Sequence, residues 1–215
     1  MDIITEFTKN ADSTQAKAMS AYMRDQFPFL GIQKPQRAVL SKVFLKSAKE
    51  ERVIDWEFVL VCWDKPEREF QYLALDYLTV LKKVVTPEDL PKLKQLAVTK
   101  SWWDTVDGLD HLIGGMVLCF PQVSATMLEW STDANFWLRR IAIDHQLTYR
   151  EKTNAALLAK IIENNLGQSE FFINKAIGWS LREYSKVAPD WVRSFIDIHR
   201  NRLTPLSIRD GSKYI

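Results

Sequence analysis

The amino-acid sequence predicts an all-α fold, an α-solenoid of HEAT-like helix pairs with a concave groove. The chain of 215 residues has only 7 glycines and is 47% hydrophobic and 26% charged, a composition that favours helices. No stretch alternates apolar and polar residues with the period of two that strands require, and no Asn-Gly hairpin turn occurs. Four similar segments recur at a constant spacing, which is typical of repeat proteins.

Capping residues, proline and glycine divide the chain into helices. Residues 12–26 begin with Asp12, a favourable N-cap, and contain neither Gly nor Pro. The segment 27–35 interrupts the helical pattern with two prolines and a glycine. The same signals predict further helices at 35–49, 52–63, 66–83, 87–98, 100–115, 121–130 and 151–165, and another that begins at Pro189.

The repeated segments begin at Ala74, Gly108, Ala142 and Ala176, so the spacing is 34 residues each time. Shorter helices lie between the long ones, and each unit is therefore a helix pair of an α-solenoid. The period equals that of tetratricopeptide repeats, but their W-x2-L-G-x2-Y pattern is absent, and HEAT-like pairs match by elimination. The small residue at each start allows neighbouring helices to approach closely. We expect residues 1–215 to form one such domain.

The charge of the chain is balanced overall and uneven locally. The net charge is +2, but six Lys or Arg stand against two acids in 34–52, and eight against four in 172–215. Basic blocks on one face can contact phosphates. Helical proteins always carry basic faces, however, so the counts alone leave both interpretations open.

Compartment and membrane signals point to a cytoplasmic protein. No apolar run approaches the ~18 residues that cross a bilayer, and the N-terminal ten residues lack the layout of a signal peptide. We therefore expect no membrane partner. Cys62 and Cys119 both lie in apolar helical runs, and we expect reduced thiols in the core.

Four residues from three successive repeats fall on one helical stripe. Counted from the small residue of each repeat, Trp103 lies at −5, Asp107 at −1, Arg140 at −2 and Trp179 at +3. Equivalent helices of a solenoid stand side by side, so these side chains should cluster. The alternative is a buried core face, but aliphatic residues occupy another face, and burying an acid and an arginine costs much desolvation energy. We expect an exposed, concave groove.

Rings, an acid and an arginine in one groove suggest cleavage of an N-glycosidic bond. Arginine grips phosphates through paired hydrogen bonds, and ring faces attract cations. A carboxylate in a cleft of low dielectric stabilises the oxocarbenium-like sugar cation of such a reaction. An alkylated, cationic base leaves as a neutral molecule and needs no general acid, so one carboxylate suffices.

At these residues the chain resembles the AlkD-type DNA alkylation repair proteins, which are HEAT-like repeat DNA glycosylases. The resemblance runs over nearly the whole chain, in five strings that follow one another in order. These are Y-M-R-D-Q-F-P-F-L-G-I-Q-K-P at 22–35, K-S-W-W-D-T-V-D at 100–107, N-F-W-L-R-R at 135–140, E-F-F-I-N-K-A-I-G-W-S-L-R-E-Y at 170–184 and T-P-L-S-I-R at 204–209.

The resemblance implies a hydrolase of base excision repair. Such an enzyme excises cationic N3- and N7-alkylated purines, 3-methyladenine and 7-methylguanine among them, from double-stranded DNA without rotating the base out of the helix. It implies Asp107 as the catalytic carboxylate, with Trp103 and Trp179 against the deoxyribose. We expect a monomer that acts in the cytoplasm of a bacterium, associated with the nucleoid.

The resemblance also implies a set of DNA contacts. Arg140 is the implied anchor of the backbone phosphate near the lesion, and the neighbouring Arg139 is an open alternative for that role. The remaining positions that match DNA-contacting parts of the family are Tyr22, Gln33, Phe172 and Arg182.

Other chemistries find no support in the sequence. The three histidines lie outside any H-E-x-x-H motif and the cysteines lack C-x-x-C spacing, so we expect no metal. Neither a Gly-rich phosphate loop nor a G-x-S-x-G elbow is present, and we expect no cofactor. The rival hypothesis is a non-catalytic HEAT-like scaffold that binds DNA or a protein, because solenoids are mostly binding proteins.

Overall fold

The computed structural model describes residues 2–215, and all of its regular structure is helical. These residues form thirteen α-helices and three short 3-10 helices, with no strand among them. The prediction of an all-α fold is confirmed. No helix in the described part of the chain has the length and apolar character that crossing a membrane requires.

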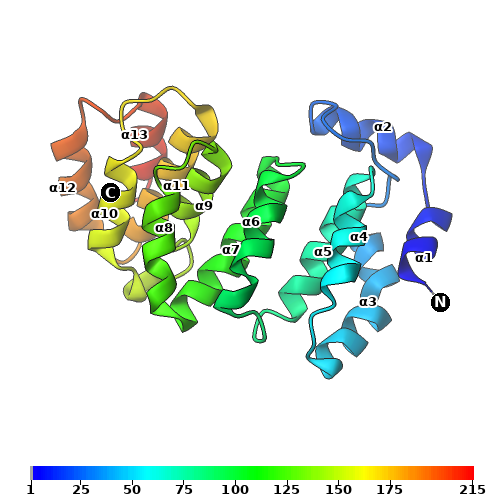
Figure 1. The fold of residues 1–215 in the computed structure, drawn as a ribbon. Coiled ribbons are helices and arrows are strands. Elements are labelled where there is room, and N and C mark those ends of the chain that lie inside the picture. Colours follow the sequence, from blue (N-terminus) through cyan, green and yellow to red (C-terminus); the bar gives the residue numbers. More distant parts are fainter. Residues whose placement is uncertain (1) are drawn as a thin grey trace. The chain divides into compact units, whose positions relative to one another are not determined.

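The chain divides into two compact units, Met1–Val85 and Thr86–Ile215. The helices of the first unit are α1 (Ile3–Lys9), α2 (Ser13–Tyr22), α3 (Lys34–Glu51), α4 (Trp56–Asp64) and α5 (Arg68–Val80). Helix α3 packs against α1 and α5, and α4 packs against α5 (Figure 1). The expectation of one domain over 1–215 stays a prediction.

Three helices of the first unit, α2, α4 and α5, are shorter than the sequence predicts, and for α2 and α4 the backbone gives the reason. Helix α2 stops at Tyr22 because Arg24 and Asp25 adopt left-handed φ angles of 56° and 54°. Arg52, with φ 58°, ends α3 in the same way, and α4 then begins after the N-cap Asp55. Left-handed conformations at non-glycine residues are difficult to anticipate from residue type.

The loop before α3 is fixed by a buried acid. The carboxylate of Glu69, which is fully buried, accepts hydrogen bonds from the backbone N–H groups of Leu30, Gly31 and Ile32 at 2.8–3.0 Å. Gly31 has φ +91°, and a Cβ there would lie 2.0 Å from a backbone oxygen. This arrangement holds Gln33 at the N-cap of α3.

The second unit is a series of helix pairs. Its α-helices are α6 (Leu90–Val98), α7 (Trp103–Cys119), α8 (Ser124–Trp130), α9 (Phe136–Asp144), α10 (Ala155–Glu163), α11 (Phe171–Ser185), α12 (Pro189–His199) and α13 (Pro205–Gly211). Helices α7, α9, α11 and α13 contact one another in that order, and α8 contacts both α9 and α10 (Figure 1). The predicted stacking of equivalent helices is therefore confirmed within this unit.

Small residues of the repeats allow the helices of the second unit to pack closely. Ala142 on α9 and Ala176 on α11 are fully buried. Gly108 on α7 is partly buried, and a close approach of this helix to its neighbour occurs at Gly114, where a Cβ would lie 2.1 Å from the backbone oxygen of His145. Glycine at 114 thus lets α7 and the end of α9 touch.

The cysteines differ in their surroundings. Cys62 on α4 is buried as predicted, and burial raises the pKa of its thiol to about 12. The prediction of a core position is wrong for Cys119, which is exposed at the last residue of α7. The face of α7 that carries Leu118 and Cys119 is turned to solvent there, as the 41% exposure of Leu118 indicates.

Candidate active site

Three helices of the second unit each deliver one residue of the predicted stripe. Helix α7 starts at Trp103, after the extended residue Trp102, and carries Asp107 one turn later. The Asn135 side chain caps α9, which carries Arg140. Helix α11 begins after the N-cap Glu170 and carries Trp179.

Arg140 and Asp107 form the central contact of the site. The guanidinium places both Nε and Nη2 at 2.8 Å from Asp107 Oδ1. Its Nη1 donates to the backbone oxygen of Phe172 at 2.7 Å, and Nη2 lies 3.7 Å from Asp144 Oδ2. The Arg140 side chain is 1% exposed and that of Asp107 is 24% exposed, so the arginine lies beneath a carboxylate that solvent can reach.

The expectation of a fully exposed stripe is wrong for Arg140. The desolvation cost that argued against burial is offset by the carboxylates of Asp107 and Asp144 and by the Phe172 carbonyl. Burial alone lowers the pKa of Arg140, but the carboxylates of Asp144, Asp107 and Asp110 together outweigh that effect and raise it. The guanidinium is therefore charged and held in place.

Trp179 completes the cluster that the stripe predicts. Its ring centroid lies 5.2 Å from the guanidinium carbon of Arg140, 5.6 Å from Lys175 Nζ and 5.9 Å from the guanidinium carbon of Arg182. Such distances suit cation–π attraction. Asp107, Arg140 and Trp179 thus lie together, and Trp103 lies one helical turn before Asp107 on α7.

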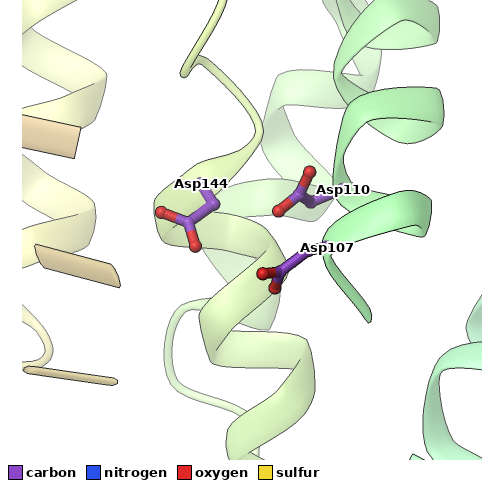
Figure 2. A group of neighbouring side chains, drawn as sticks. All are labelled: Asp107, Asp110 and Asp144. Carbon is purple, nitrogen blue, oxygen red and sulfur yellow. The ribbon is translucent and has the colours of Figure 1, made fainter. Parts of the chain in front are cut away.

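Two further carboxylates stand beside Asp107. One oxygen each from Asp107, Asp110 and Asp144 lie within 4.8 Å of one another, with two of the side chains on α7 and the third on α9 (Figure 2). Asp110 and Asp144 are buried, and no residue that the structure describes forms a hydrogen bond with Oδ2 of either one. Ser180 Oγ donates to Asp144 Oδ1 at 3.1 Å and holds that side chain from α11.

The spacing of these three carboxylates would suit a metal ion, but a cation of the protein is already there. Arg140 Nη2 lies 2.8 Å from Asp107 Oδ1 and 3.7 Å from Asp144 Oδ2. The guanidinium therefore supplies positive charge that a metal would otherwise bring. The expectation of a metal-free protein stays a prediction.

Burial dominates the ionisation of the carboxylates. Burial raises the pKa of Asp107, while the Arg140 guanidinium opposes the rise. Burial and the neighbouring carboxylates also raise the pKa of Asp110 and that of Asp144. Asp107 is the member of the cluster with two bonds to the arginine and access to solvent, so it is the one suited to face a substrate as an anion.

A hollow of about 320 Å³ opens beside Asp107. Helices α7 and α11 and the loop after α9 form its walls. Its lining residues are Asp107, Asp110, His111, Leu147, Thr148, Trp179, Arg182 and Glu183. The hollow joins the catalytic candidate Asp107 to Trp179 and Arg182, two other residues singled out from the sequence.

The remaining predicted contacts have different surroundings. Arg139 is partly buried, and its Nη1 donates to the backbone oxygen of Asp133 at 3.2 Å. The Phe172 ring belongs to an aromatic cluster, with ring centroids 5.2 Å from Trp102 and 4.9 Å from Trp137. Trp102 is thus a packing residue.

Tyr22 and Gln33 belong to the first unit, and both are exposed there. Tyr22 ends α2 with 73% of its surface exposed. Gln33 Nε2 donates to Gln15 Oε1 at 2.8 Å.

Asp110, His111 and Asp144 were not predicted from the sequence as residues of the site. The sequence did contain a pattern that could have indicated Asp110 and Asp144. Each stands two residues after the small residue of its repeat, as does Asp76 in the first unit, so the acids recur at one register position. Residues at one register of a solenoid lie on adjacent helices, which predicts their approach.

Comparisons with known proteins agree with this fold. Residues 3–215 match the sequence profile of the family described as DNA alkylation repair enzyme. The solved structure of a predicted DNA alkylation repair enzyme from Enterococcus faecalis matches with a TM-score of 0.88 and 38% identity, over 95% of this chain and 96% of that one. The Streptococcus mutans protein smu.31 matches with a TM-score of 0.61 and 18% identity, over 83% and 96%, which shows likeness of fold alone. No curated protein sequence matches.

Proposed function

This protein belongs to the DNA alkylation repair enzyme family, and from that premise we propose that it is a DNA glycosylase. Its substrates are cationic N3- and N7-alkylated purines in duplex DNA, such as 3-methyladenine and 7-methylguanine. The observation that carries the proposal is the solvent-accessible Asp107 carboxylate, which two bonds from the buried Arg140 fix beside Trp179.

The proposed reaction is hydrolysis through a sugar cation. The bond between C1′ of the deoxyribose and the base nitrogen breaks, and its electron pair neutralises the cationic base, which leaves. The Asp107 carboxylate stabilises the positive charge that develops on the sugar. A water molecule adds to C1′ and releases one proton to solvent, so the products are a neutral base and an abasic site.

Aromatic rings and a fixed acid lower the barrier together. Trp103 and Trp179 contact the deoxyribose, where their ring faces attract the developing cation by about 0.5–2 kcal/mol each. Because Arg140 already fixes Asp107, the carboxylate need not reorganise as charge develops. The acid acts on the sugar, so the lesion can stay in the helix without rotation into a base pocket.

The proposed DNA contacts extend beyond this centre. Arg140 donates one of its bonds to a neutral carbonyl, that of Phe172, and a phosphate anion in its place would gain charge–charge attraction. Arg139 is the alternative anchor for that phosphate. The other proposed contacts with the duplex are Phe172, Arg182, Tyr22 and Gln33. We propose that the protein acts as a monomer, without a cofactor, on the nucleoid in the cytoplasm.

Release of free base from methylated duplex DNA tests the proposal. The protein is incubated with DNA that carries 3-methyladenine and 7-methylguanine, and free bases are separated and quantified by mass spectrometry. We expect both bases in solution, a matching number of abasic sites, and no release of unmodified purines. The rival, a non-catalytic scaffold, binds the same duplex and releases nothing. Binding without release in this assay would replace our proposal by the scaffold.

A further inference from the structure

His111 lies at the hollow beside Asp107 and is held by a buried acid. It follows Asp107 by one helical turn on α7 and lines the same hollow. Its Nδ1 lies 2.5 Å from Asp110 Oδ1. The Asp110 side chain is 1% exposed, whereas that of His111 is 58% exposed, so the buried carboxylate anchors an imidazole that faces solvent.

The bond to Asp110 determines what the other ring nitrogen offers. The two nitrogens of an imidazole lie on different sides of the ring, so Nε2 is directed away from Asp110. When the pair holds two protons, one lies between Asp110 and Nδ1 and the other is on Nε2. Nε2 carries its proton whether the shared proton is on the Asp110 carboxyl or on Nδ1. Nε2 is then a hydrogen-bond donor, and the imidazolium form also carries positive charge.

The charged groups around His111 favour the protonated pair. The hydrogen bond to Asp110 is the largest cause that raises the pKa of His111; burial opposes it, and the carboxylates of Asp110, Asp107 and Asp144 add to the rise. Two charged residues of α11, Arg182 and Glu183, line the same hollow, and Arg140 on α9 pairs with Asp107 and Asp144.

The guanidinium of Arg182 is a second positively charged group at the hollow, in addition to the protonated pair of Asp110 and His111. Its Nε lies 3.4 Å from Glu183 Oε1, but Glu183 is also bound by Lys186 Nζ at 2.5 Å. Two cations therefore share the one acid of α11 that lines the hollow. His111 on α7 and Arg182 on α11 both line the hollow, so each can donate to an anion bound there.

We propose that this hollow binds a phosphodiester group of the DNA backbone through His111 Nε2–H and the guanidinium of Arg182. The inference rests on the proposed function in making DNA the ligand, and it adds His111 and Asp110 to the recognition of the strand. The bound phosphate is one next to the sugar at Asp107. The contact weakens when the pair of Asp110 and His111 loses a proton.

Equilibrium binding of an unmodified, fluorescently labelled duplex tests the proposal without any chemistry. Anisotropy titrations run from about pH 6 to 9, which spans values above the ordinary histidine pKa of about 6.5. For the natural protein, affinity falls as pH rises, and the slope of log affinity against log salt decreases by about one charge. The His111→Gln variant binds about ten-fold more weakly at the low end and loses that pH dependence.

Two variants test whether the pH dependence belongs to the pair of Asp110 and His111. His199→Gln changes a histidine of α12 that does not line the hollow, and its pH dependence should match that of the natural protein. Asp110→Asn keeps the imidazole but removes the charge that holds its proton, so the midpoint of the pH dependence moves down. His145 does not interfere, because burial lowers its pKa to about 4. If His111→Gln keeps the natural pH dependence, the proposal is wrong.

Inorganic phosphate distinguishes a free anion from the DNA backbone. At constant ionic strength, the imidazole resonance of His111 is followed by NMR as phosphate is added, and again as the duplex is added. A shift with both, together with the weaker duplex binding of His111→Gln, supports the proposal. A shift with phosphate but unchanged duplex affinity in the variant overturns it. If the protein releases no base but its DNA binding still depends on pH through His111, the proposed glycosylase activity is wrong and the proposed phosphate site stands.

Discussion

Both Nε and Nη2 of Arg140 lie 2.8 Å from the same oxygen of Asp107, Oδ1, across the contact between α7 and α9. The other oxygen, Oδ2, accepts no hydrogen bond from any residue that the structure describes. One side of the carboxylate is therefore fixed within the protein, and the other remains for a substrate. Each partner balances the charge of the other, so under the proposed function the same pair serves both stability and catalysis.

Replacing Arg140 by Ala should affect stability, catalysis and DNA binding together. The buried Asp144 and the fixed Asp107 lose their cation, which we expect to destabilise the fold by about 3 kcal/mol. If the guanidinium also meets a phosphate, the salt slope of DNA binding decreases by about one. Chemical denaturation and salt-dependent binding measure the two effects, with Arg139→Ala as the matched neighbour. An unchanged salt slope would restrict Arg140 to the support of Asp107.

Replacing Trp179 by Ala should slow base release more than it weakens DNA binding. The ring lies among three cations and is proposed to face the sugar, where its attraction is greatest in the transition state. We expect a loss of about ten-fold in the single-turnover rate. Trp191→Ala is the control, because Trp191 stacks on Phe195 in α12 and does not line the hollow. Equal losses in both variants would indicate a general effect of removing an indole.

Adding one methyl group at Gly114 should damage the contact between α7 and the end of α9. A Cβ at this position would lie 2.1 Å from the backbone oxygen of His145, which cannot yield as a side chain could. We expect Gly114→Ala to lower the free energy of unfolding by about 2 kcal/mol. At Gly115 no atom of the described residues lies within 4 Å of such a Cβ, so Gly115→Ala should leave stability unchanged or raise it by about 0.5–1 kcal/mol. Urea denaturation measures both.

The buried carboxyl of Asp144 should make the fold less stable as pH rises. Burial raises its pKa in the folded state above the unfolded value of about 3.9, so the native protein binds more protons between those two values. The free energy of unfolding therefore falls as pH rises through that window. Asp144→Asn, which stays neutral, should show a smaller fall between about pH 4 and 6.

Asp210 provides a control of the opposite sign for that measurement. Burial is the largest single cause and acts to raise its pKa, but the hydrogen bonds and charges of Lys175 and Arg209 together outweigh burial and lower it. Its contribution to stability is present above the unfolded pKa and is lost as pH falls through the folded value. Asp210→Asn should therefore be less stable than the natural protein at neutral pH.

Identical pH profiles for Asp144→Asn and the natural protein would contradict the assignment of Asp144.

The sequence could predict the helical repeats and the meeting of Asp107, Arg140 and Trp179, because both depend on a constant register. It could not predict that Arg140 is buried. That outcome depends on Asp144 and the Phe172 carbonyl, whose positions depend on how three helices pack. The helix ends near Arg24 and at Arg52 could not be predicted either, because arginine is not a residue type that indicates a left-handed backbone conformation.

The role proposed for His111 could not be predicted from the sequence either. Read alone, a histidine without a metal motif indicates no function. Its significance comes from a buried acid beside it and a hollow beyond it, both of which require the packing of α7 against its neighbours. The repeated acid at one register position was visible in the sequence, but only the structure shows that its members on α7 and α9 meet around Arg140.

The most direct test of the account is the single-turnover release of 7-methylguanine from methylated duplex DNA by Asp107→Asn. The amide keeps the shape of the side chain but cannot stabilise the sugar cation, so we expect the rate to fall by at least about 100-fold. Duplex binding should survive, and Asp104→Asn on the same helix should keep most of its activity. Release by Asp107→Asn at the natural rate would contradict the central claim that this carboxylate is catalytic.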